Sequence, residues 1–503
     1  MDCKVVFTSE VKCQLQGLTL EDKKVLYNKY SFFVPSARFS PLYKLGRWNG
    51  KVYYFTEGAS TYVSLLPEII HYLQQRGYNI IYESYFQRKE FNFPEIDEHY
   101  LNNIKWFKGH KLEGQPVEMF DHQVKAVNAL LKSQHGIAQV ATSGGKTLIS
   151  LALAKAVLPY GKFIIIEPTT DLTLQTADFY KNLGFKCGIV GLGRREFDND
   201  IIVATWQTLL SLERRGKKKN AKLKDILSLE DLESLKKDVV ALAFDECHLV
   251  AANEIFKILS DQFKEVPLRW GLTGTVPKGK EEYYPLICGI GSVVVSVDSK
   301  ELQDKGVLAQ SNITILSMKD DSKYEEYDEE FKYLASNPDK IIFEAKIIAQ
   351  ASNAGNTLVL VQRLETGKKL VKVLKEMLDK DAVFLSGKDK SEIRMEEYKA
   401  MQEGNNKIII ATAQIASTGL DIPRIFNMIY IDMGKSFVKT IQSIGRGLRT
   451  YTDKNKVQVF DICSSTKFSK RHMKERIKYY IEKEHPWQMI NIEQWKETDE
   501  QTK

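Results

Sequence analysis

The hydrophobic positions of this chain fall into two series of short, uninterrupted apolar runs, which are separated by segments of helical periodicity. An apolar run without polar alternation is typical of a strand buried on both faces of a parallel sheet. Two such series predict two α/β lobes, each built on its own parallel sheet. The predicted strands are residues 137–142, 163–168, 201–205 and 239–246 in the first lobe, and 357–362, 382–387, 407–412, 428–432 and 457–461 in the second.

Between the two series, residues 299–322 lack the rhythm of a strand or a helix, so we place the linker near residues 300–310. The acidic stretch that follows predicts a helix ending before Asn337 and Pro338, because a residue that precedes proline disfavours the helical conformation. Short strands, aromatic residues and a proline-bracketed turn near the N-terminus indicate a small α+β domain. The chain therefore divides into that domain at 1–95, a first lobe at 96–305, a second lobe at 306–465 and a basic helical tail at 466–503.

Composition adds little to this organisation. Lys and Arg number 72 against 65 Asp and Glu, and the resulting charge of +7 permits a polyanionic partner without requiring one. The cysteines show no CxxC spacing, so neither a disulfide framework nor a zinc site is indicated, and a reducing compartment fits best. The N-terminus lacks a signal-peptide core, and no stretch reaches the roughly 18–20 apolar residues of a membrane span. We expect a soluble, cytoplasmic protein with no membrane partner.

A phosphate-binding loop follows the first predicted strand, where the sequence SGGKT (143–147) leads into a helical segment. Glycines let backbone N–H groups face phosphates, and the helix N-terminus adds a favourable dipole. Lys146 is expected to reach the β and γ phosphates, and the Thr147 hydroxyl to bind Mg²⁺. The strict motif has a glycine where Val140 stands, so the pattern alone leaves open a glycine turn that opens an ordinary helix. The residues expected around the nucleotide are Thr142, Ser143, Gly144, Gly145, Lys146 and Thr147.

Two adjacent carboxylates end the run 239–246, at the edge of a parallel sheet where side chains emerge. Asp245 is expected to hold magnesium, and Glu246 to polarise the attacking water. A solvated acidic strand end would look the same, but placement in the same expected sheet as Lys146 favours a site. We interpret Cys247 as a packing residue and His248 as a polar coupler.

The ordered segments ATSGGKT, DECH, LTGT and QSIGRGLR make the chain resemble a superfamily 2 helicase over about residues 115–465. The resemblance implies two tandem RecA-like lobes that use ATP and Mg²⁺, with LTGT (272–275) coupling hydrolysis to lobe movement. It implies that Gln123 reads the adenine edge, that Gly419 and Asp421 face the nucleotide, and that Gln442, Arg446 and Arg449 form the arginine motif. The residues that it places on the nucleic-acid strand are Thr169, Thr170, Thr205, Gln207, Gln362, Arg363, Ser386, Gly387 and Thr412.

The arginines of this motif also have a physical rationale. Negative charge builds up on the γ-phosphoryl oxygens during hydrolysis, and a guanidinium from an opposing lobe that stabilises it changes the rate by about 10³–10⁵. If Arg446 and Arg449 reach the nucleotide only when the lobes close, then hydrolysis is coupled to closure, and repeated closure on a strand produces stepping. The isolated pattern would equally fit a solvated basic helix face, but the full set of motifs favours a motor.

Basic and aromatic residues interleave around Gly46 and Gly50 in the segment 40–53, which can offer phosphates a cationic surface and bases a stacking face. Trp48 would equally fit a core position. With the small domain around it, the segment resembles the phage UvsW-like recombination and repair helicases, although Asn49 stands where an acidic residue is expected. That family implies 3′ to 5′ remodelling of forks, Holliday junctions and R-loops, and strand annealing, in the host cytoplasm. The residues expected on DNA are Lys44, Arg47, Trp48 and Lys51.

Two further basic stretches, 214–224 and 467–480, could grip duplex phosphates or could be a solvated insertion and an ordinary basic helix. Neutralising Lys217, Lys218 and Lys219 would test the first of them, because a phosphate contact that is lost flattens the salt dependence of binding.

The leading hypothesis is a monomeric DNA helicase whose partners are branched DNA or duplex–single-strand junctions, with RNA–DNA hybrids as further substrates. An RNA helicase or a restriction-type translocating subunit is a second reading, although DECH and the small first domain favour DNA. A third is an annealing module with an inactive ATPase. A binding module has no need for Lys146, Asp245, Glu246, Arg446 and Arg449 together.

Overall fold

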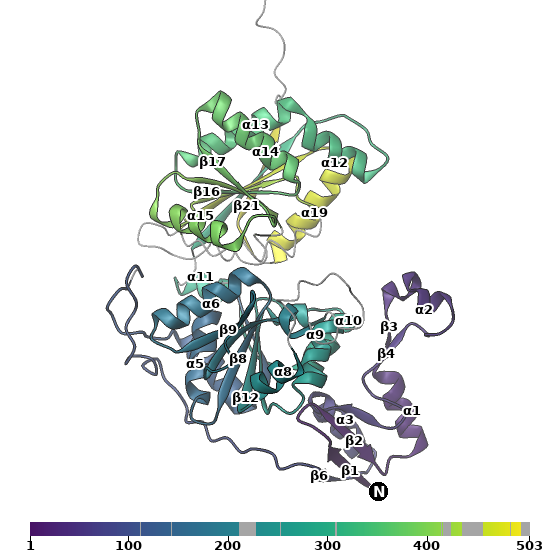
Figure 1. Ribbon diagram of the computed structural model, residues 1–503. Coiled ribbons are helices and arrows are strands. Elements are labelled where there is room, and N and C mark those ends of the chain that lie inside the picture. The colour runs from purple at the N-terminus through teal and green to yellow at the C-terminus, as the bar shows by residue number, and fades with distance from the viewer. Residues whose placement is uncertain are drawn as a thin grey trace, which may run out of the picture. The chain divides into compact units, whose positions relative to one another are not determined.

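A computed structural model of the chain describes residues 1–110, 112–141, 143–210, 228–251, 253–306, 309–413, 415, 424–434, 456–482 and 484–493. The chain forms two compact units (Figure 1). The first contains Met1–Val140 and Gly145–Ser296, and the second contains Ala141–Gly144 and Val297–Lys503. Among the described residues, no helix is long and apolar enough to cross a membrane.

The N-terminal domain is an α+β fold, as the sequence predicts. Its sheet has the order β5-β2-β1-β6, and β3 and β4 form a separate two-stranded ribbon. Helix α3 packs through Leu66, Ile69 and Leu73, whose spacing of three and four places them on one face. The elements are β1 (Asp2–Phe7), β2 (Lys12–Gln16), α1 (Leu20–Lys29), β3 (Ser31–Phe33), η1 (Pro35–Phe39), α2 (Pro41–Lys44), β4 (Lys51–Tyr53), β5 (Ser60–Tyr62), η2 (Val63–Leu65), α3 (Leu66–Gln75) and β6 (Asn79–Ser84).

This domain shares a continuous hydrophobic core with the first lobe. The ring of Tyr284, in the lobe, lies 4.6 Å from the ring of Phe32 and 5.5 Å from that of Tyr54. Tyr62 contacts Phe256 of the lobe at 5.5 Å between ring centroids. The N-terminal domain is therefore joined to the first lobe by aromatic packing and not only by the chain.

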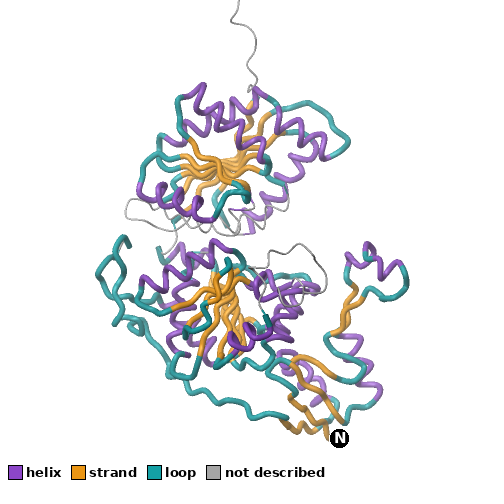
Figure 2. The backbone as a smooth tube through the Cα atoms, in the orientation of Figure 1, coloured by secondary structure: helices purple, strands orange, loops and turns teal. Residues whose placement is uncertain are grey.

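The first lobe is built on an eight-stranded sheet of order β10-β9-β11-β8-β12-β13-β7-β14, with helices on both faces (Figure 2). Helices α5 and α6 cover one face, and α8, α9 and α10 the other (Figure 1). The strands are β7 (His135–Val140), β8 (Lys162–Glu167), β9 (Cys187–Gly191), β10 (Arg194–Arg195), β11 (Ile201–Thr205), β12 (Val239–Asp245), β13 (Leu268–Thr273) and β14 (Val293–Val297). The helices are α4 (Asp121–Ser133), α5 (Lys146–Val157), α6 (Thr170–Asn182), α7 (Trp206–Leu209), α8 (Leu229–Lys236), η5 (Cys247–Ala251), α9 (Asn253–Lys257), η6 (Ile258–Gln262) and α10 (Lys280–Gly289).

All four strands predicted for the first lobe are confirmed as β7, β8, β11 and β12, whereas β9, β10, β14 and the interior strand β13 were not predicted. The apolar run of β13 is interrupted by Arg269, which is nevertheless buried. The Arg269 guanidinium donates from Nη1 to Phe263 O at 2.6 Å and from Nε to Gly289 O at 2.9 Å. A charged residue in a central strand is tolerated here because its donors are satisfied by backbone carbonyls.

The second lobe has a seven-stranded parallel sheet of order β17-β18-β16-β19-β20-β15-β21. Helices α13 and α14 pack on one face, and α15 and α19 on the other. The elements are α11 (Ser299–Asp304), β15 (Gln310–Met318), α12 (Tyr327–Ser336), α13 (Pro338–Ser352), β16 (Thr357–Val361), α14 (Leu364–Leu378), β17 (Ala382–Leu385), α15 (Ser391–Glu403), β18 (Ile408–Thr412), β19 (Asn427–Ile431), β20 (Lys456–Ser464), α19 (Lys467–Glu482) and β21 (Trp487–Ile492).

Two expectations for this lobe were wrong. The segment 299–322, predicted to lack regular structure, contains helix α11 and the nine-residue strand β15. Strand β15 begins with polar residues that alternate with buried ones, so the bare apolar run that marked the other strands is absent from its first half. The segment 466–503 was predicted as a helical tail, but its strand β21 pairs with β15 and extends the sheet. The acidic helix does end at Ser336, as expected.

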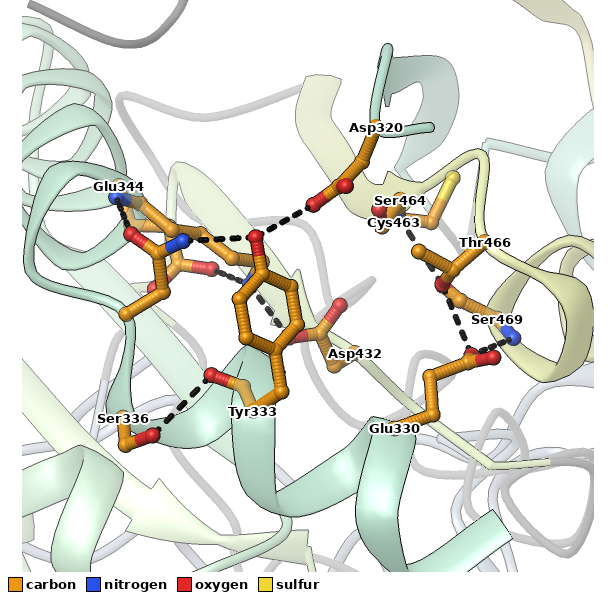
Figure 3. Close-up of polar contacts among 12 residues, drawn as sticks. Asp320, Glu330, Tyr333, Ser336, Glu344, Asp432, Cys463, Ser464, Thr466 and Ser469 are labelled. Atoms are coloured by element: carbon orange, nitrogen blue, oxygen red, sulfur yellow. Dashed lines mark hydrogen bonds and ion pairs between the residues drawn. The ribbon is translucent and has the colours of Figure 1, made fainter. Parts of the chain in front are cut away.

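A buried polar network supports the second lobe (Figure 3). Glu330 of α12 accepts hydrogen bonds from Thr466 Oγ1 at 2.8 Å and from the N–H of Ser469 at 2.8 Å, so its carboxylate caps the first turn of α19. Nearby, the buried Lys340 ammonium donates to both Glu344 and Asp432. Within the part of the chain that the structure describes, Glu344 Oε2 has no hydrogen-bond partner. One cation is thus shared between two buried carboxylates.

This arrangement predicts a pH dependence of stability. Burial raises the pKa of Glu344 from 4.5 to about 7. A carboxyl whose pKa is higher in the folded state stabilises the fold at low pH, and this contribution is lost as the pH rises through the folded pKa. We expect the second lobe to lose roughly 1–3 kcal/mol of stability between about pH 5 and pH 8 for this reason. Hydrogen exchange of β16 and β19 amides across this range measures the loss.

The matched comparison is Glu344→Gln, which removes the titration and should flatten this part of the pH profile. Glu403→Gln, at an exposed ion pair with Lys399, serves as a control and should keep the wild-type profile. A Glu344→Gln variant with an unchanged profile would show that Glu344 stays ionised.

Candidate active site

The loop that the sequence predicts to bind phosphate lies at the end of β7, where helix α5 begins at Lys146. Gly145 precedes the helix with φ 81°, and Ser143 also has a positive φ of 66°. These left-handed residues turn the chain sharply from strand to helix, which brings backbone N–H groups to the helix N-terminus. Val140, which replaces the glycine of the strict motif, is the last residue of β7 and fully buried, so the strand itself occupies this position.

Gln123 lies against this loop from the first turn of α4. Its Oε1 accepts a hydrogen bond from the N–H of Phe120 at 2.9 Å, and its side chain is buried. A Cβ added to Gly145 would collide with the Gln123 side-chain amide. The structure thus brings Gln123 to the predicted nucleotide loop, while its contact with adenine stays a prediction.

Replacing Gly145 by Ala is expected to reduce ATP affinity by at least about tenfold, because the added methyl group both strains the left-handed backbone and displaces Gln123. Gly184→Ala is the matched control, since Gly184 has φ 85° and open space around it. Both variants should lose about 1 kcal/mol of stability, but only Gly145→Ala should lose nucleotide. Binding of a fluorescent ATP analogue and thermal melting separate these effects, and equal affinity of the two variants would contradict the argument.

The two adjacent carboxylates end strand β12, two strands away from β7 in the sheet. Asp245 Oδ1 accepts a hydrogen bond from the N–H of Glu246 at 2.9 Å. Glu246 itself has φ 47°, an uncommon conformation for a residue with a side chain. This turn directs its carboxylate toward Lys146, whose Nζ lies 3.4 Å from Glu246 Oε1. The side chains of Lys146 and Glu246 are only 8% and 12% exposed, so the pair is shielded from solvent.

Polar contacts continue from this pair to the segment LTGT. His248 Nδ1 lies 3.5 Å from Glu246 Oε2 and 3.0 Å from Thr273 Oγ1. The Thr273 hydroxyl in turn donates to Thr275 O at 2.9 Å and accepts from the N–H of Thr275 at 3.1 Å. This chain of contacts agrees with the interpretation of His248 as a coupler between DECH and LTGT.

Cys247 faces away from this chemistry. Its sulfur packs against Gly271 of β13, where an added Cβ would lie 2.7 Å from Sγ. The residue is fully buried, and burial raises the pKa of the thiol well above its ordinary value. These facts agree with a packing role.

The residues present fit a magnesium ion that is held partly by a nucleotide. Among the described residues, no group of three His, Cys, Asp or Glu side chains could hold a metal by itself. Mg²⁺ is commonly bound by one or two carboxylates together with substrate phosphates and waters. Asp245, at the strand end, and Thr147, in the first turn of α5, are the residues that would hold it.

The strand-contact residues predicted for the first lobe lie at the ends of β8 and β11, which are neighbours in the sheet. Thr169 caps helix α6 by accepting from the N–H of Leu172 at 3.3 Å, with Thr170 next to it. Gln207 donates to Pro168 O at 3.1 Å. Thr205 is buried, and its hydroxyl lies 2.8 Å from that of Thr208, so it holds the turn and does not face solvent.

Trp206, which was not among the predicted residues, also lies at this edge. Its indole Nε1 donates to Pro168 O at 3.0 Å, alongside the Gln207 amide. Pro168 follows β8 directly, so Trp206 and Gln207 together tie the two loops to each other. An aromatic residue that follows a buried strand would have been the available signal.

The residues predicted in the second lobe also meet at one sheet edge, because β16, β17 and β18 are adjacent and parallel. Arg363 lies over the ring of Phe331 at 4.6 Å. Gln362 lies beside Gly434, where an added Cβ would be 3.2 Å from its Nε2. Thr412 ends β18, and Ser386, after β17, donates to Asp389 Oδ2 at 2.9 Å. Gly387 next to it has open space around its Cα.

Several predicted residues lie outside the described residues: Thr142, Gly419, Asp421, Gln442, Arg446, Arg449 and the basic stretch 214–224. The other basic stretch, 467–480, lies in α19 and is partly structural, since Arg476 forms a buried bidentate pair with Asp461 at 2.8 and 2.9 Å. In the N-terminal domain, Lys44, Arg47 and Lys51 are exposed. Trp48 is half-buried, and its Nε1 donates to Lys51 O at 2.8 Å.

Comparisons with known proteins give three family matches and several relatives. The families described as "DNA helicase UvsW, N-terminal", "Type III restriction enzyme, res subunit" and "Helicase conserved C-terminal domain" match residues 9–83, 116–278 and 339–451. The "ATP-dependent DNA helicase uvsW" of Enterobacteria phage T4 is 24% identical over 500 residues, covering 95% of this chain and 94% of that protein. The "DNA 3'-5' translocase XPB2" of Sulfurisphaera tokodaii is 28% identical over 224 residues, 44% of each chain.

Among solved structures, that of the "ATP-dependent Type ISP restriction-modification enzyme LlaBIII bound to DNA" matches with a TM-score of 0.55 at 12% identity. The match covers 86% of this chain and 34% of that one. At this identity the likeness concerns the fold alone.

Proposed function

We propose that this chain, a superfamily 2 helicase that resembles the phage UvsW-like enzymes in all three of its parts, unwinds or remodels branched DNA in recombination and repair. The chain is an ATP-dependent helicase by its two helicase domains. The observation that supports a working ATPase best is the shielded pair of Lys146 and Glu246, at 3.4 Å, where the phosphate loop meets the carboxylates of β12. A solvated turn or a solvated acidic strand end would not bury this pair.

In this proposal Lys146 binds the β and γ phosphates, and Glu246 accepts a proton from the attacking water as that water approaches the γ-phosphorus. Asp245 and Thr147 would hold Mg²⁺, which would neutralise charge on the phosphate oxygens. The contacts from Glu246 through His248 to Thr273 pass a change at the carboxylate to the LTGT segment. Arg446 and Arg449, which lie outside the described residues, are proposed to complete the charge stabilisation.

DNA is the proposed partner for two reasons. The relative that covers nearly the whole chain is named a DNA helicase, and the N-terminal match is to a DNA-helicase family. The exposed cations of the N-terminal domain suit phosphate contacts. RNA–DNA hybrids are further substrates in the proposal, and the enzyme acts as a monomer.

The test is ATP hydrolysis by the wild type and by Lys146→Ala with no nucleic acid, duplex DNA, forked DNA, single-stranded DNA and single-stranded RNA, at one salt concentration. The proposal expects many-fold stimulation by DNA, strongest with forks, and none in the variant. Stimulation by RNA alone would replace it with the RNA-helicase alternative. An absence of hydrolysis throughout would leave an annealing module.

A further inference from the structure

The N-terminal domain carries an arm formed by residues 31–53, whose tip stands apart from the rest of the domain (Figures 1 and 2). Its base is the ribbon of β3 and β4, which pairs Ser31 with Tyr53 and Phe33 with Lys51. Its tip contains η1 and α2. The arm is therefore an ordered projection with a defined end.

The tip has a small core of its own. Val34 N–H donates to Gly50 O at 2.8 Å, and Ala37 is buried. Gly50 packs so closely on Phe33 that an added Cβ would collide with its ring. The rings of Phe33 and Tyr43 lie 5.8 Å apart, edge to face. These contacts fix the backbone from which the tip's side chains project.

Three large apolar side chains project from this tip into solvent. Phe39, Leu42 and Leu45 are 80%, 53% and 66% exposed. Phe39 ends η1, Leu42 lies in α2 and Leu45 is the C-cap of α2, so all three belong to the same short tip. We name this set the apolar ridge. Single exposed apolar residues are ordinary, but a group on an ordered projection is typical of a binding surface.

The ridge is set in an entirely cationic stretch of chain. No acidic residue lies between Asp22 and Glu57 in the sequence. Arg38 and Lys44 are neighbours of ridge residues, and both are exposed. This charge suits a polyanionic partner such as DNA. The basic residues of the stretch are Lys23, Lys24, Lys29, Arg38, Lys44, Arg47 and Lys51.

We propose that the apolar ridge packs against the last base pair of a duplex at a DNA junction, while the cations around it bind the phosphates. Nucleic-acid-binding proteins insert Phe and Leu side chains between base steps, which costs the free energy of unstacking the bases. Contact with a base face that is already exposed at a junction does not require this unstacking. The basic side chains position the backbone without reading sequence. The inference rests on the proposed function, and it assigns the recognition of branch points to this tip.

The test places 2-aminopurine either at the junction or within the duplex of a forked DNA, and compares the wild type with Phe39→Ala/Leu42→Ala/Leu45→Ala. Leu20→Ala/Tyr85→Ala is the matched control, since these residues are 85% and 72% exposed in the same domain but outside the arm. The wild type and the control should change the fluorescence at the junction only, without ATP. The ridge variant should lose this signal and unwind forks about tenfold more slowly.

Two further readouts isolate the ridge. Its variant should keep the ATPase stimulation by single-stranded DNA and the salt slope of binding, whereas Arg38→Ala/Lys44→Ala/Arg47→Ala should lower the slope. A ridge variant that keeps the junction signal and the unwinding rate overturns the inference. A wild-type dimer that the ridge variant dissolves overturns it too, by assigning the ridge to protein contact.

The proposed function and this inference can fail separately. If the wild type unwinds no DNA, the proposed function fails, yet the junction fluorescence still decides whether the ridge contacts the base pair. If the triple variant melts at a lower temperature than the control, Phe39→Ala alone, at the most exposed position, supplies the same comparison.

Discussion

Replacing Glu246 by Gln is expected to lower kcat for ATP hydrolysis by about 10²–10⁴-fold while nucleotide binding is retained. The amide keeps the shape of the side chain but cannot accept the proton of the attacking water. Glu246 lies 3.4 Å from Lys146, in a position that is shielded from solvent. Single-turnover hydrolysis, measured together with the binding of a fluorescent ATP analogue, separates the chemical step from affinity.

Glu265→Gln is the control for this variant, since Glu265 is an exposed carboxylate of the same lobe that pairs with Lys264 at 3.7 Å. It should hydrolyse ATP at the wild-type rate. A Glu246→Gln enzyme that retains more than a tenth of wild-type kcat would assign the proton to another group and leave Glu246 as the partner that orients Lys146.

Lys146→Ala is expected to lose both ATP binding and ATP hydrolysis, with kcat/KM for ATP reduced by about 10³-fold or more. In the proposed mechanism Lys146 supplies the positive charge at the phosphate loop, and its removal also leaves the Glu246 carboxylate without that cation at 3.4 Å. Lys146→Arg should fail nearly as completely, because the side chain is only 8% exposed and a planar guanidinium does not fit a site shaped for an ammonium.

Isothermal titration with ATP and steady-state hydrolysis check this expectation, and strand annealing provides an internal control. If annealing persists in Lys146→Ala while unwinding is lost, the two activities coexist in one chain. Near-normal hydrolysis in Lys146→Ala would mean that the loop after β7 is not the phosphate site.

The sequence predicted those strands that are buried on both faces along their length. Strands β8 and β11 are buried along almost their whole length, so their residues are apolar without interruption. Strands β13 and β15 escaped because the buried Arg269 interrupts the first, and polar residues alternate through the start of the second. Edge strand β21 is mostly exposed, and its composition does not distinguish it from a solvated tail. Whether these segments form strands depends on contacts with distant parts of the chain, and the local sequence pattern carries no information about those contacts.

For the site, the order of strands and motifs along the chain predicted which residues lie close together, but it did not predict the side-chain geometry. Lys146 and Glu246 come together because β7 and β12 are parallel strands of one sheet. The positive φ of Glu246, which turns its carboxylate toward Lys146, has no signature in the sequence. The same is true of the contact between His248 and Thr273, which depends on the neighbouring position of β12 and β13. Side-chain geometry at strand ends is set by the turn that follows, and turns of one composition adopt several conformations.

The aromatic core shared by the N-terminal domain and the first lobe has a consequence for synthesis on the ribosome. Tyr54 is made early, but Tyr284, whose ring covers it at 5.5 Å, follows 284 − 54 = 230 residues later. At about 5–20 residues per second, the aromatic face of the new domain stays uncovered for roughly 10 to 50 s. During that interval the nascent chain exposes Phe32, Tyr54 and Tyr62, so it is a substrate for chaperones and prone to self-association. A fragment that ends near residue 95 retains this state permanently and should be recovered mainly in inclusion bodies.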